Sequence, residues 1–491
     1  MRSKRTSIAA CCALVVSGCM LGPDYTRPSV QVPDQFRTQP PASAAETTPQ
    51  SADMHQQLWW QEMQDPALDS LIRDALANNQ DLLAAAARVD QYYGILGTTR
   101  SAFFPQIGAE LDGTRSRVSE RAVGSAPQRN PYNTVQADVF ASWEIDLFGR
   151  IRRQTEAARA NLMATEEARR GVVLSLVASV ASGYINLRDL DQQLIVARDT
   201  LASRRDALDL FEKRYRGGVV SELEFSQARS EYANALASVP VIEQRIAEQE
   251  NALSVLVGRN PGPIPRGKAI YEMSSLSVPA GLPSDLLERR PDILQAEQQL
   301  VAANADIGAA RALYFPVISL TGLFGGASTS LNGLWSGPGR VWSYAANVSM
   351  PLFTGGNIRG QVAAAEARQQ EAVALYRKAI QTAFQETENA IVGLQKTQAA
   401  RDALVMQVDA LRVYARAARL RYEGGYSSYL EVLDAERSLF AAELQLSQSQ
   451  ADAMVQYVSL YRAMGGPWLA SADALVPQSG PALDRNPPAF P

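Results

Sequence analysis

The chain has 491 residues, of which 46% are hydrophobic and 20% are charged, but only 7% are aromatic. Ala, Leu and Val supply most of the apolar fraction, and this composition favours long helices over compact globular cores. The 47 Lys and Arg residues and the 51 Asp and Glu residues give a net charge of −4, which disfavours binding to nucleic acid.

The first 18 residues have the pattern of a secretory signal peptide. A positive start with Arg2, Lys4 and Arg5 precedes a short apolar run over residues 6–16, which ends in Val-Ser-Gly-Cys19. This ending resembles a bacterial lipobox, in which the Cys is lipidated and becomes the first residue of the mature chain. An ordinary signal peptide that happens to contain cysteines is the alternative. In such lipoproteins, an Asp directly after the lipidated Cys resembles a signal for retention in the inner membrane. This chain has Met20 at that position, so we expect the protein acylated at Cys19 to be sorted to the outer membrane.

Cysteine and histidine are scarce, which limits the possible chemistry. Cys11, Cys12 and Cys19 lie in the first twenty residues, and His55 is the single His. Beyond residue 55, zinc sites of Cys and His, Cys nucleophiles, Ser-His-Asp triads and disulfides are therefore excluded. An enzyme would have to use carboxylates or Lys, but the acids recur on the surfaces of predicted long helices, which offer no pocket. We expect no metal, no catalytic site, no enzymatic activity and no cofactor other than the lipid.

The chain contains an internal duplication. Arg100-Ser-Ala-Phe-Phe-Pro105 is matched by Arg311-Ala-Leu-Tyr-Phe-Pro316, and two Arg-Tyr-x-Gly-Gly-x-x-Ser segments begin at Arg214 and Arg421. Matched landmarks in the same order predict two repeats of about 200 residues. We place the boundaries at 1–18 for the signal peptide, 19–65 for an N-terminal anchor and equatorial segment, 66–257 for repeat 1, 258–282 for an equatorial linker, 283–464 for repeat 2 and 465–491 for a tail.

Each repeat is predicted to contain a helix, two strands, a long helix, a tip turn and a helix. The first helix is expected at about 66–102 in repeat 1 and at about 283–313 in repeat 2. The strands are expected at 105–118, 134–147, 316–329 and 341–353. Along 135–147 every odd-numbered residue is apolar, while Gln, Asp, Ser and Glu predominate between them, which is typical of a membrane-barrel strand. A soluble sandwich strand alternates in the same way, but very long helices leave little for a sandwich to pack against.

Four strands cannot close a barrel by themselves. The most apolar helical run, 172–187, is interrupted by Ser, Gly and Asn, so a membrane crossing requires a barrel rather than a helix. A homotrimer with twelve strands leaves an aqueous lumen, whereas a dimer with eight would be filled by its own side chains. The long helix after residue 151, about 64 residues and roughly 96 Å, predicts that an α-helical coiled-coil barrel continues the β-barrel.

These features together resemble the outer-membrane factors of tripartite efflux pumps, the TolC-like channel-tunnels, and in particular their NodT/OprM-like lipoprotein branch. The matching motifs are the lipobox, Trp59-Trp60, Arg289-Arg290-Pro291-Asp292-Ile293, Pro351-Leu352-Phe353 and the two Arg-Tyr turns. The resemblance implies a trimeric exit duct of an RND-type system, anchored in outer-membrane lipid and extending into the periplasm. It would passively conduct drugs or other small toxic compounds delivered by an inner-membrane transporter and a periplasmic adaptor protein. The alternatives are an exit channel for type I protein secretion and a lipid-anchored periplasmic structural coiled coil.

The two tip turns carry the candidate site. Gly217, Gly218, Gly424 and Gly425 allow the chain to reverse, and Ser221 and Ser428 stand where the next helices need N-caps. The resemblance implies that the adaptor contacts these turns. It also implies a periplasmic gate formed by Glu431 and Asp434, which would make rings of three acids in a trimer, and by a lock between Tyr422 and Glu224. A solvated helix face is the alternative for the acids. Ser427 replaces a tip arginine found in some members, so one gate contact is expected to be absent.

Overall fold

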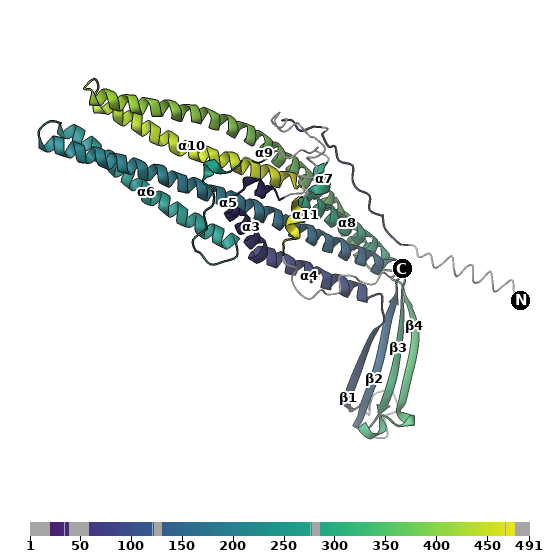
Figure 1. Ribbon diagram of the computed structural model, residues 1–491. Coiled ribbons are helices and arrows are strands. Elements are labelled where there is room, and N and C mark those ends of the chain that lie inside the picture. Colours follow the sequence, from purple (N-terminus) through teal and green to yellow (C-terminus); the bar gives the residue numbers. More distant parts are fainter. Residues whose placement is uncertain are drawn as a thin grey trace. The chain divides into compact units, whose positions relative to one another are not determined.

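The computed structural model in Figure 1 describes residues 20–33, 35–38, 58–119, 121, 130–274, 276, 285–466 and 468–476. Cys19 and the predicted signal peptide therefore lie outside the described residues. The chain divides into two compact units, the first comprising 1–29, 89–165 and 295–377 and the second 30–88, 166–294 and 378–491. Each unit takes segments from both predicted repeats, because two long helices run through both units.

The first unit contains one antiparallel sheet of four strands in the order β1-β2-β3-β4. The strands are β1 (Gln106–Ser116), β2 (Tyr132–Ile145), β3 (Val317–Ser328) and β4 (Arg340–Ser349). The short 3₁₀ turns η5 (Leu331–Gly333) and η6 (Gly337–Gly339) connect β3 to β4. The last strand ends four residues before the predicted 353, because Pro351 has no backbone N–H to donate to a ladder.

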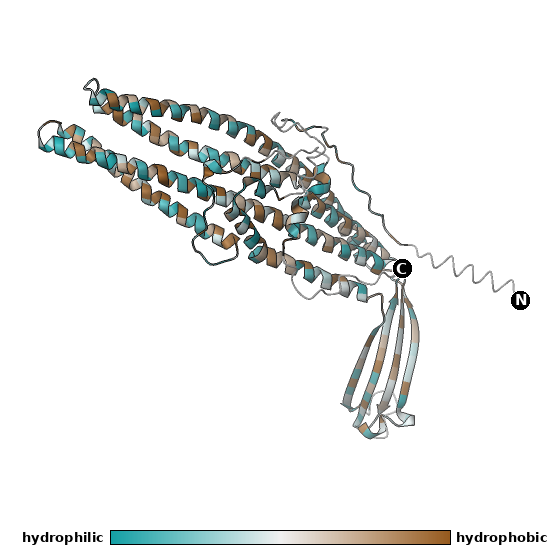
Figure 2. Ribbon diagram, viewed as in Figure 1, coloured by the Kyte–Doolittle hydropathy of each residue, from teal (hydrophilic) through white to brown (hydrophobic). Residues whose placement is uncertain are grey.

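The strand register separates the sheet into two different faces. Glu110 pairs with Asp138, which pairs with Gly325, whereas the next row contains Ala137 paired with Gly326. Because paired residues point to the same side, the register collects the polar positions of all strands on one face and the apolar positions on the other. Figure 2 shows hydrophobic and hydrophilic residues interspersed along the strands, as this alternation requires.

The helices are long and mostly unbroken. They are α3 (Pro66–Asn78), α4 (Gln80–Ser101), α5 (Arg150–Arg216), α6 (Glu222–Leu256), α7 (Leu286–Arg289), α8 (Pro291–Ala312), α9 (Asn357–Glu423), α10 (Tyr429–Met464) and α11 (Trp468–Asp473). Both α5 and α9 have 67 residues and are therefore about 100 Å long. In Figure 1 each of them turns back into its successor, so that α5 with α6 and α9 with α10 form two antiparallel hairpins.

Two helices predicted as continuous are each divided in two. The predicted helix 66–102 breaks at Asn79, whose extended backbone leaves its side-chain oxygen free to accept from the Leu82 amide at 3.0 Å. The predicted helix 283–313 breaks at Arg290, because a residue before proline disfavours the helical conformation.

An aromatic cluster forms the centre of the second unit. Trp59, in the 3₁₀ turn η2 (Trp59–Met63), stacks on Tyr461 with ring centroids 5.2 Å apart. Trp60 and Trp468 meet Trp59 edge to face at 5.7 and 6.1 Å. The cluster packs with apolar residues of α3, α5, α6 and α10, so large side chains set the spacing of these helices.

One apolar window of α5 belongs to this core. Among the described helices, α5 alone has an 18-residue window of mean hydropathy sufficient for a membrane span, at 1.3, although the sequence was not expected to contain such a helix. The structure buries 56% of that window, and Val173, Val177 and Tyr184 lie in the core of the second unit. The apolar character of the helix is therefore accounted for by packing within the protein.

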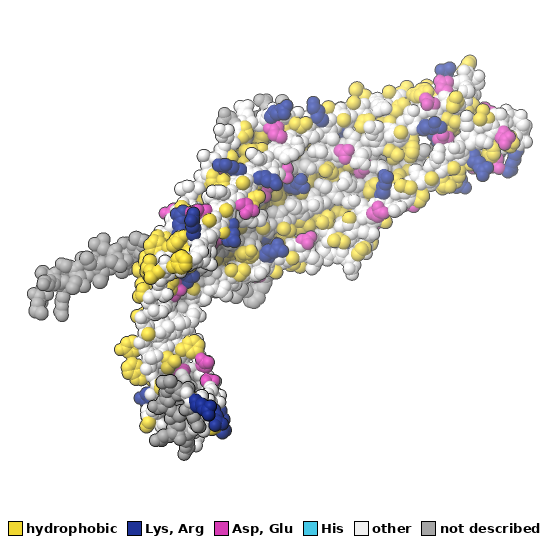
Figure 3. Space-filling view, turned by 180° about the vertical axis from the view of Figure 1, so that it is seen from behind, with side chains coloured by type: hydrophobic (Ala, Val, Ile, Leu, Met, Phe, Trp, Pro, Cys, Tyr) yellow, Lys and Arg dark blue, Asp and Glu magenta, His cyan; other side chains and the backbone are white. Residues whose placement is uncertain are grey.

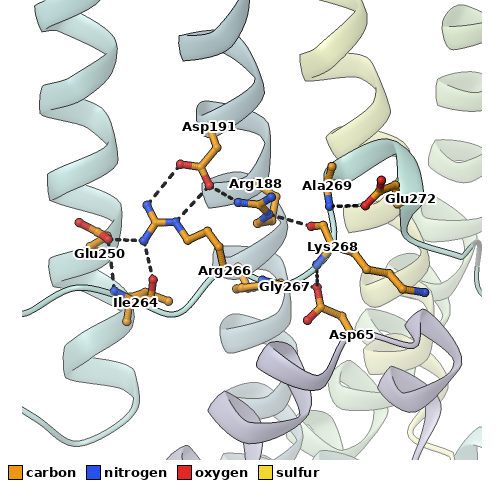
Figure 4. Close-up of polar contacts among 11 residues, drawn as sticks. Asp65, Arg188, Asp191, Glu250, Ile264, Arg266, Gly267, Lys268, Ala269 and Glu272 are labelled. Atoms are coloured by element: carbon orange, nitrogen blue, oxygen red, sulfur yellow. Dashed lines mark hydrogen bonds and ion pairs between the residues drawn. The ribbon is translucent and has the colours of Figure 1, made fainter.

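The linker after α6 is fastened to the helices by ion pairs and a helix cap (Figure 4). The Arg266 guanidinium pairs with Asp191 of α5 and with Glu250 of α6. Asp65 caps α3 by accepting from its first amides, and its second oxygen accepts from the Lys268 amide at 2.9 Å. These contacts hold residues 264–272, which include η3 (Ile270–Glu272), against three helices.

Candidate functional site

The two tip turns have nearly identical backbones. Gly218 and Gly425 adopt φ of 70° and 77°, in the left-handed region that favours glycine. The Val219 amide donates to the Arg214 carbonyl at 2.9 Å, and the Tyr426 amide donates to the Arg421 carbonyl at 2.8 Å. Both helices thus end in the same glycine-dependent motif before the chain reverses.

The helices that follow the turns begin differently. At the start of α6, the Ser221 hydroxyl accepts from the Glu224 amide at 3.3 Å, and the Glu224 carboxylate accepts from the Ser221 amide at 2.9 Å, forming a capping box. Ser428 precedes α10 at the equivalent position, but its side chain makes no capping bond. Glu431, three residues later, instead pairs with Arg421 at 3.2 Å. The second turn therefore lacks the box that stabilises the first.

The predicted lock between Tyr422 and Glu224 is not made within this chain. The Tyr422 hydroxyl accepts a hydrogen bond from Arg214 at 2.8 Å, and that guanidinium lies 5.9 Å from the centre of the tyrosine ring. The Glu224 carboxylate is occupied by its own capping box. Asp434 is exposed at the surface of α10 and accepts from the Tyr414 hydroxyl at 3.4 Å. Ser427 buries its hydroxyl without a hydrogen-bond partner among the described residues.

An apolar cluster joins the ends of the two hairpins. Phe211 contacts Tyr429 with ring centroids 4.2 Å apart, and Tyr422 lies 5.2 Å from Tyr429. Burial raises the pKa of Tyr429 to about 12, so this phenol stays neutral. Around the cluster, Arg204 pairs with Glu436 at 2.8 Å. The tips are therefore packed around aromatic side chains, with a largely buried ion pair beside them.

The charged partners at the tips were not among the predicted site residues. Arg214 and Arg421 occupy the same position in the two Arg-Tyr turns, but one binds Tyr422 and the other binds Glu431. The repetition of the Arg-Tyr pair in both turns was the sequence signal that could have identified these two arginines. Which partner each arginine takes depends on the packing of one hairpin against the other.

The polar face of the sheet is acidic. Within the four strands, this face includes Glu110, Asp112, Asp138 and Glu144 and contains no Lys or Arg. The opposite face includes Ile107, Leu111, Trp143 and Trp342, all of which are exposed in the single chain. An exposed apolar face opposite a polar one is what a strand between lipid and water requires.

Comparisons with known proteins agree with this geometry. The family described as outer membrane efflux protein matches residues 71–259 and 282–466. The solvent efflux pump outer membrane protein SrpC of Pseudomonas putida is 36% identical over 466 residues, covering 93% of this chain and 97% of the relative. The chain belongs to the outer membrane efflux protein family. The solved structure of CusC, which is 34% identical, covers 91% of this efflux protein and 100% of its own chain with a TM-score of 0.80. The open state of the Neisseria gonorrhoeae MtrE outer membrane channel is 32% identical, with a TM-score of 0.78 and coverages of 92% and 99%.

Family membership establishes the general role of this efflux protein. It is an outer-membrane exit duct of a tripartite efflux system, in a family of channel proteins rather than enzymes. The predicted fold class is confirmed: a mainly α chain adds four strands to a trimeric twelve-stranded barrel, which an α-helical barrel continues.

Proposed function

We propose that the trimeric pore closes by pairing of β4 of each chain with β1 of the next. The observation that supports this most directly is the four-stranded sheet with two unpaired edges, β1 and β4, an acidic face and an apolar face. Unpaired strand edges are not tolerated in lipid, so each β4 must pair with the β1 of a neighbour. Chemical crosslinking of native envelopes should recover trimers, and recovery of monomers alone would contradict the proposal.

We further propose that Cys19 is lipidated and anchors the protein at the inner surface of the outer membrane. The chain two residues after it is held in place, since the Leu21 amide donates to the carbonyl of Phe148, which lies between β2 and α5, at 3.4 Å. Arg153, 1% exposed, donates to the Leu21 carbonyl at 3.0 Å and pairs with Asp24 at 2.8 Å. An acyl chain on Cys19 would therefore emerge from the protein near the ends of the strands. Metabolic labelling with a palmitate analogue should label the parent protein but not Cys19→Ala.

The tips are proposed to form the periplasmic gate and the docking site for the adaptor. Glu431 and Asp434 lie three residues apart on α10, so each would form a ring of three acids around a trimer axis. The turns that contain Gly217, Gly218 and Ser221, and Gly424, Gly425 and Ser428, would contact the adaptor. An inner-membrane transporter of the RND type would deliver the cargo.

The cargo is proposed to be drugs or other small toxic compounds. SrpC is named for solvents and CusC for cations, and both are relatives of comparable identity. The polar face of the sheet, which would line the duct, is acidic and has no Lys or Arg within the four strands, and this charge favours cationic and neutral solutes over anions. Type I protein secretion is the alternative, and secreted-protein profiles of a deletion strain, measured beside its drug sensitivities, would separate the two.

Conductance of the purified protein in planar bilayers tests the duct and the gate together. A closed tip gives the parent a small current, and Asp434→Ala should raise it because it removes three charges and the Tyr414 contacts. Asp402→Ala is the matched control, since Asp402 is an exposed acid on α9 whose one ion-pair partner among the described residues is its neighbour Arg401. Complete absence of current would contradict the duct, as expected of a structural coiled coil. Equal currents in Asp434→Ala and the parent would remove Asp434 from the gate.

A further inference from the structure

The apolar face of the sheet carries charge at one end only. Within the four strands, Arg115 and Arg340 are the charged residues of this face, and no acid lies on it. Both are near the hairpin connections, at the end of the sheet away from the helices that precede β1 and follow β2. An otherwise apolar surface with arginines at a single edge indicates an anionic partner at that edge.

A hollow of about 600 Å³ lies beside Arg340 on this face. Ala109 and Ala137 provide small side chains in its lining, and Phe324 and Trp335 provide large ones. The connection after β3 closes one side, because the Leu334 carbonyl oxygen lies only 2.2 Å from where a Cβ on Gly326 would stand. Figure 3 shows hydrophobic side chains on the sheet, some of them next to acidic and basic side chains. The lining also includes Glu110 and Asp138, which the strand register places on the opposite, polar face of the sheet. On the apolar face the hollow is therefore open, lined mainly by apolar side chains and bordered by Arg340.

Arg340 has no partner among the described residues. It is exposed, and neither a hydrogen bond nor an ion pair joins it to any other residue in the described ranges. Trp335, which also lines the hollow, is 82% exposed. A guanidinium at the edge of a membrane is stabilised by a phosphate, which it binds through two parallel N–H donors.

The position of the hollow in the membrane indicates which lipid it would bind. With the helices in the periplasm, the hairpin end of the sheet is at the cell surface, where the outer leaflet consists of lipopolysaccharide. Its lipid A part combines phosphates with acyl chains. We propose that the hollow binds an acyl chain of lipid A while Arg340 binds a lipid A phosphate. This inference rests on the proposed orientation of the sheet in the membrane.

Native mass spectrometry of the intact, full-length oligomer tests the site. Purified lipid A is titrated into the detergent-solubilised protein, and phosphatidylglycerol is titrated in parallel. We expect Arg340→Gln to weaken lipid A binding at least about tenfold, because a charge-assisted pair is lost. Ala137→Phe, which fills the hollow and keeps both arginines, should weaken it as well. Arg115→Gln is the matched control, since it removes the same charge from the same face but does not line the hollow.

Four results would overturn the proposal. They are absence of bound lipid A in the parent, equal losses in Arg340→Gln and Arg115→Gln, undiminished binding in both Arg340→Gln and Ala137→Phe, and equal binding of phosphatidylglycerol and lipid A. The same preparations are measured in planar bilayers, where Arg340→Gln should conduct like the parent because Arg340 lies on the lipid side. A conducting parent without bound lipid A refutes the lipid site alone, whereas a parent that does not conduct refutes the proposed duct.

Discussion

Asp189 is a carboxylate buried in the helical part of the protein without a cation among its described contacts. It lies on α5, is 2% exposed and accepts hydrogen bonds from the Ser447 hydroxyl and, at 2.7 Å, from the Gln193 amide. Burial raises its pKa to about 6; the two hydrogen bonds oppose this change, and the nearby Asp452 adds to it. We predict that Asp189→Asn stabilises the protein at neutral pH.

The magnitude and sign follow from the two pKa values. An unfolded aspartate titrates near 3.9, so a folded pKa of about 6 corresponds to about 3 kcal/mol. Because the folded value is the higher one, this free energy favours the folded state below about pH 4 and is lost as the pH rises through 6. An asparagine at position 189 is neutral at every pH in this range, and its side-chain oxygen still accepts from the Ser447 hydroxyl. The Gln193 side-chain amide can turn so that its oxygen accepts from the asparagine NH₂ group. The variant should therefore gain up to about 3 kcal/mol at pH 8 and nothing at pH 4.

Thermal unfolding of the detergent-solubilised protein, followed by circular dichroism from pH 4 to pH 8, measures this difference. We expect Asp189→Asn to raise the midpoint at pH 8 and the difference from the parent to vanish towards pH 4. Asp191→Asn is the control, because Asp191 lies on the same helix but pairs with Arg188 and Arg266, so its loss should lower the midpoint. A midpoint of Asp189→Asn that does not exceed the parent's at pH 8, or a gain of equal size at every pH, would refute the reasoning.

Three further predictions concern the turns and the N-terminal segment. Ser221→Ala should cost about 1 kcal/mol in thermal unfolding because it breaks the capping box, whereas Ser428→Ala should cost much less; equal losses would argue against the difference between the turns. Gly425→Ala should cost about 1 kcal/mol through its positive φ. Gly424→Ala would meet the exposed Tyr426 ring, which has room to turn away, and the Leu420 carbonyl oxygen at 3.3 Å, so it should cost less in the same assay. Arg153→Met should release residues 21–24 at a cost of about 3 kcal/mol, because Arg153 binds their carbonyls and pairs with Asp24. Hydrogen exchange of residues 21–24 should then be faster than in the parent, and unchanged exchange would contradict the prediction.

The sequence predicted the sheet well because its signal is local. Alternation over 135–147 requires only that one face meets lipid and the other water, and β2 spans 132–145. The end of β4 was placed too late because apolar residues continue beyond Pro351, which interrupts the ladder. The break at Asn79 was missed because its cap depends on a single side chain. The break at Arg290 was also missed, although Pro291 was a sequence signal for it.

The candidate site was less predictable because its contacts join distant segments. Resemblance supplied the positions of Tyr422 and Glu224, but not that Arg214 from the other hairpin would take the tyrosine. Similarly, nothing in the residue spacing indicates that Arg421 pairs with Glu431, whereas Arg214 does not pair with Glu224, which caps α6 instead. Such choices are made by the packing of Phe211 against Tyr429, which no sequence window contains.

Duplication followed by divergence explains how two similar turns acquired different properties. Both contain a serine followed three residues later by glutamate, the sequence of a capping box, yet only Ser221 and Glu224 form one. In the second turn Arg421 pairs with Glu431, so the first amides of α10 lack the side-chain acceptors that stabilise α6. Unwinding the first turn of α10 therefore costs less than unwinding that of α6. If the tips open, the second turn is the one that rearranges with the smaller loss of hydrogen bonds, and it carries both proposed gate acids.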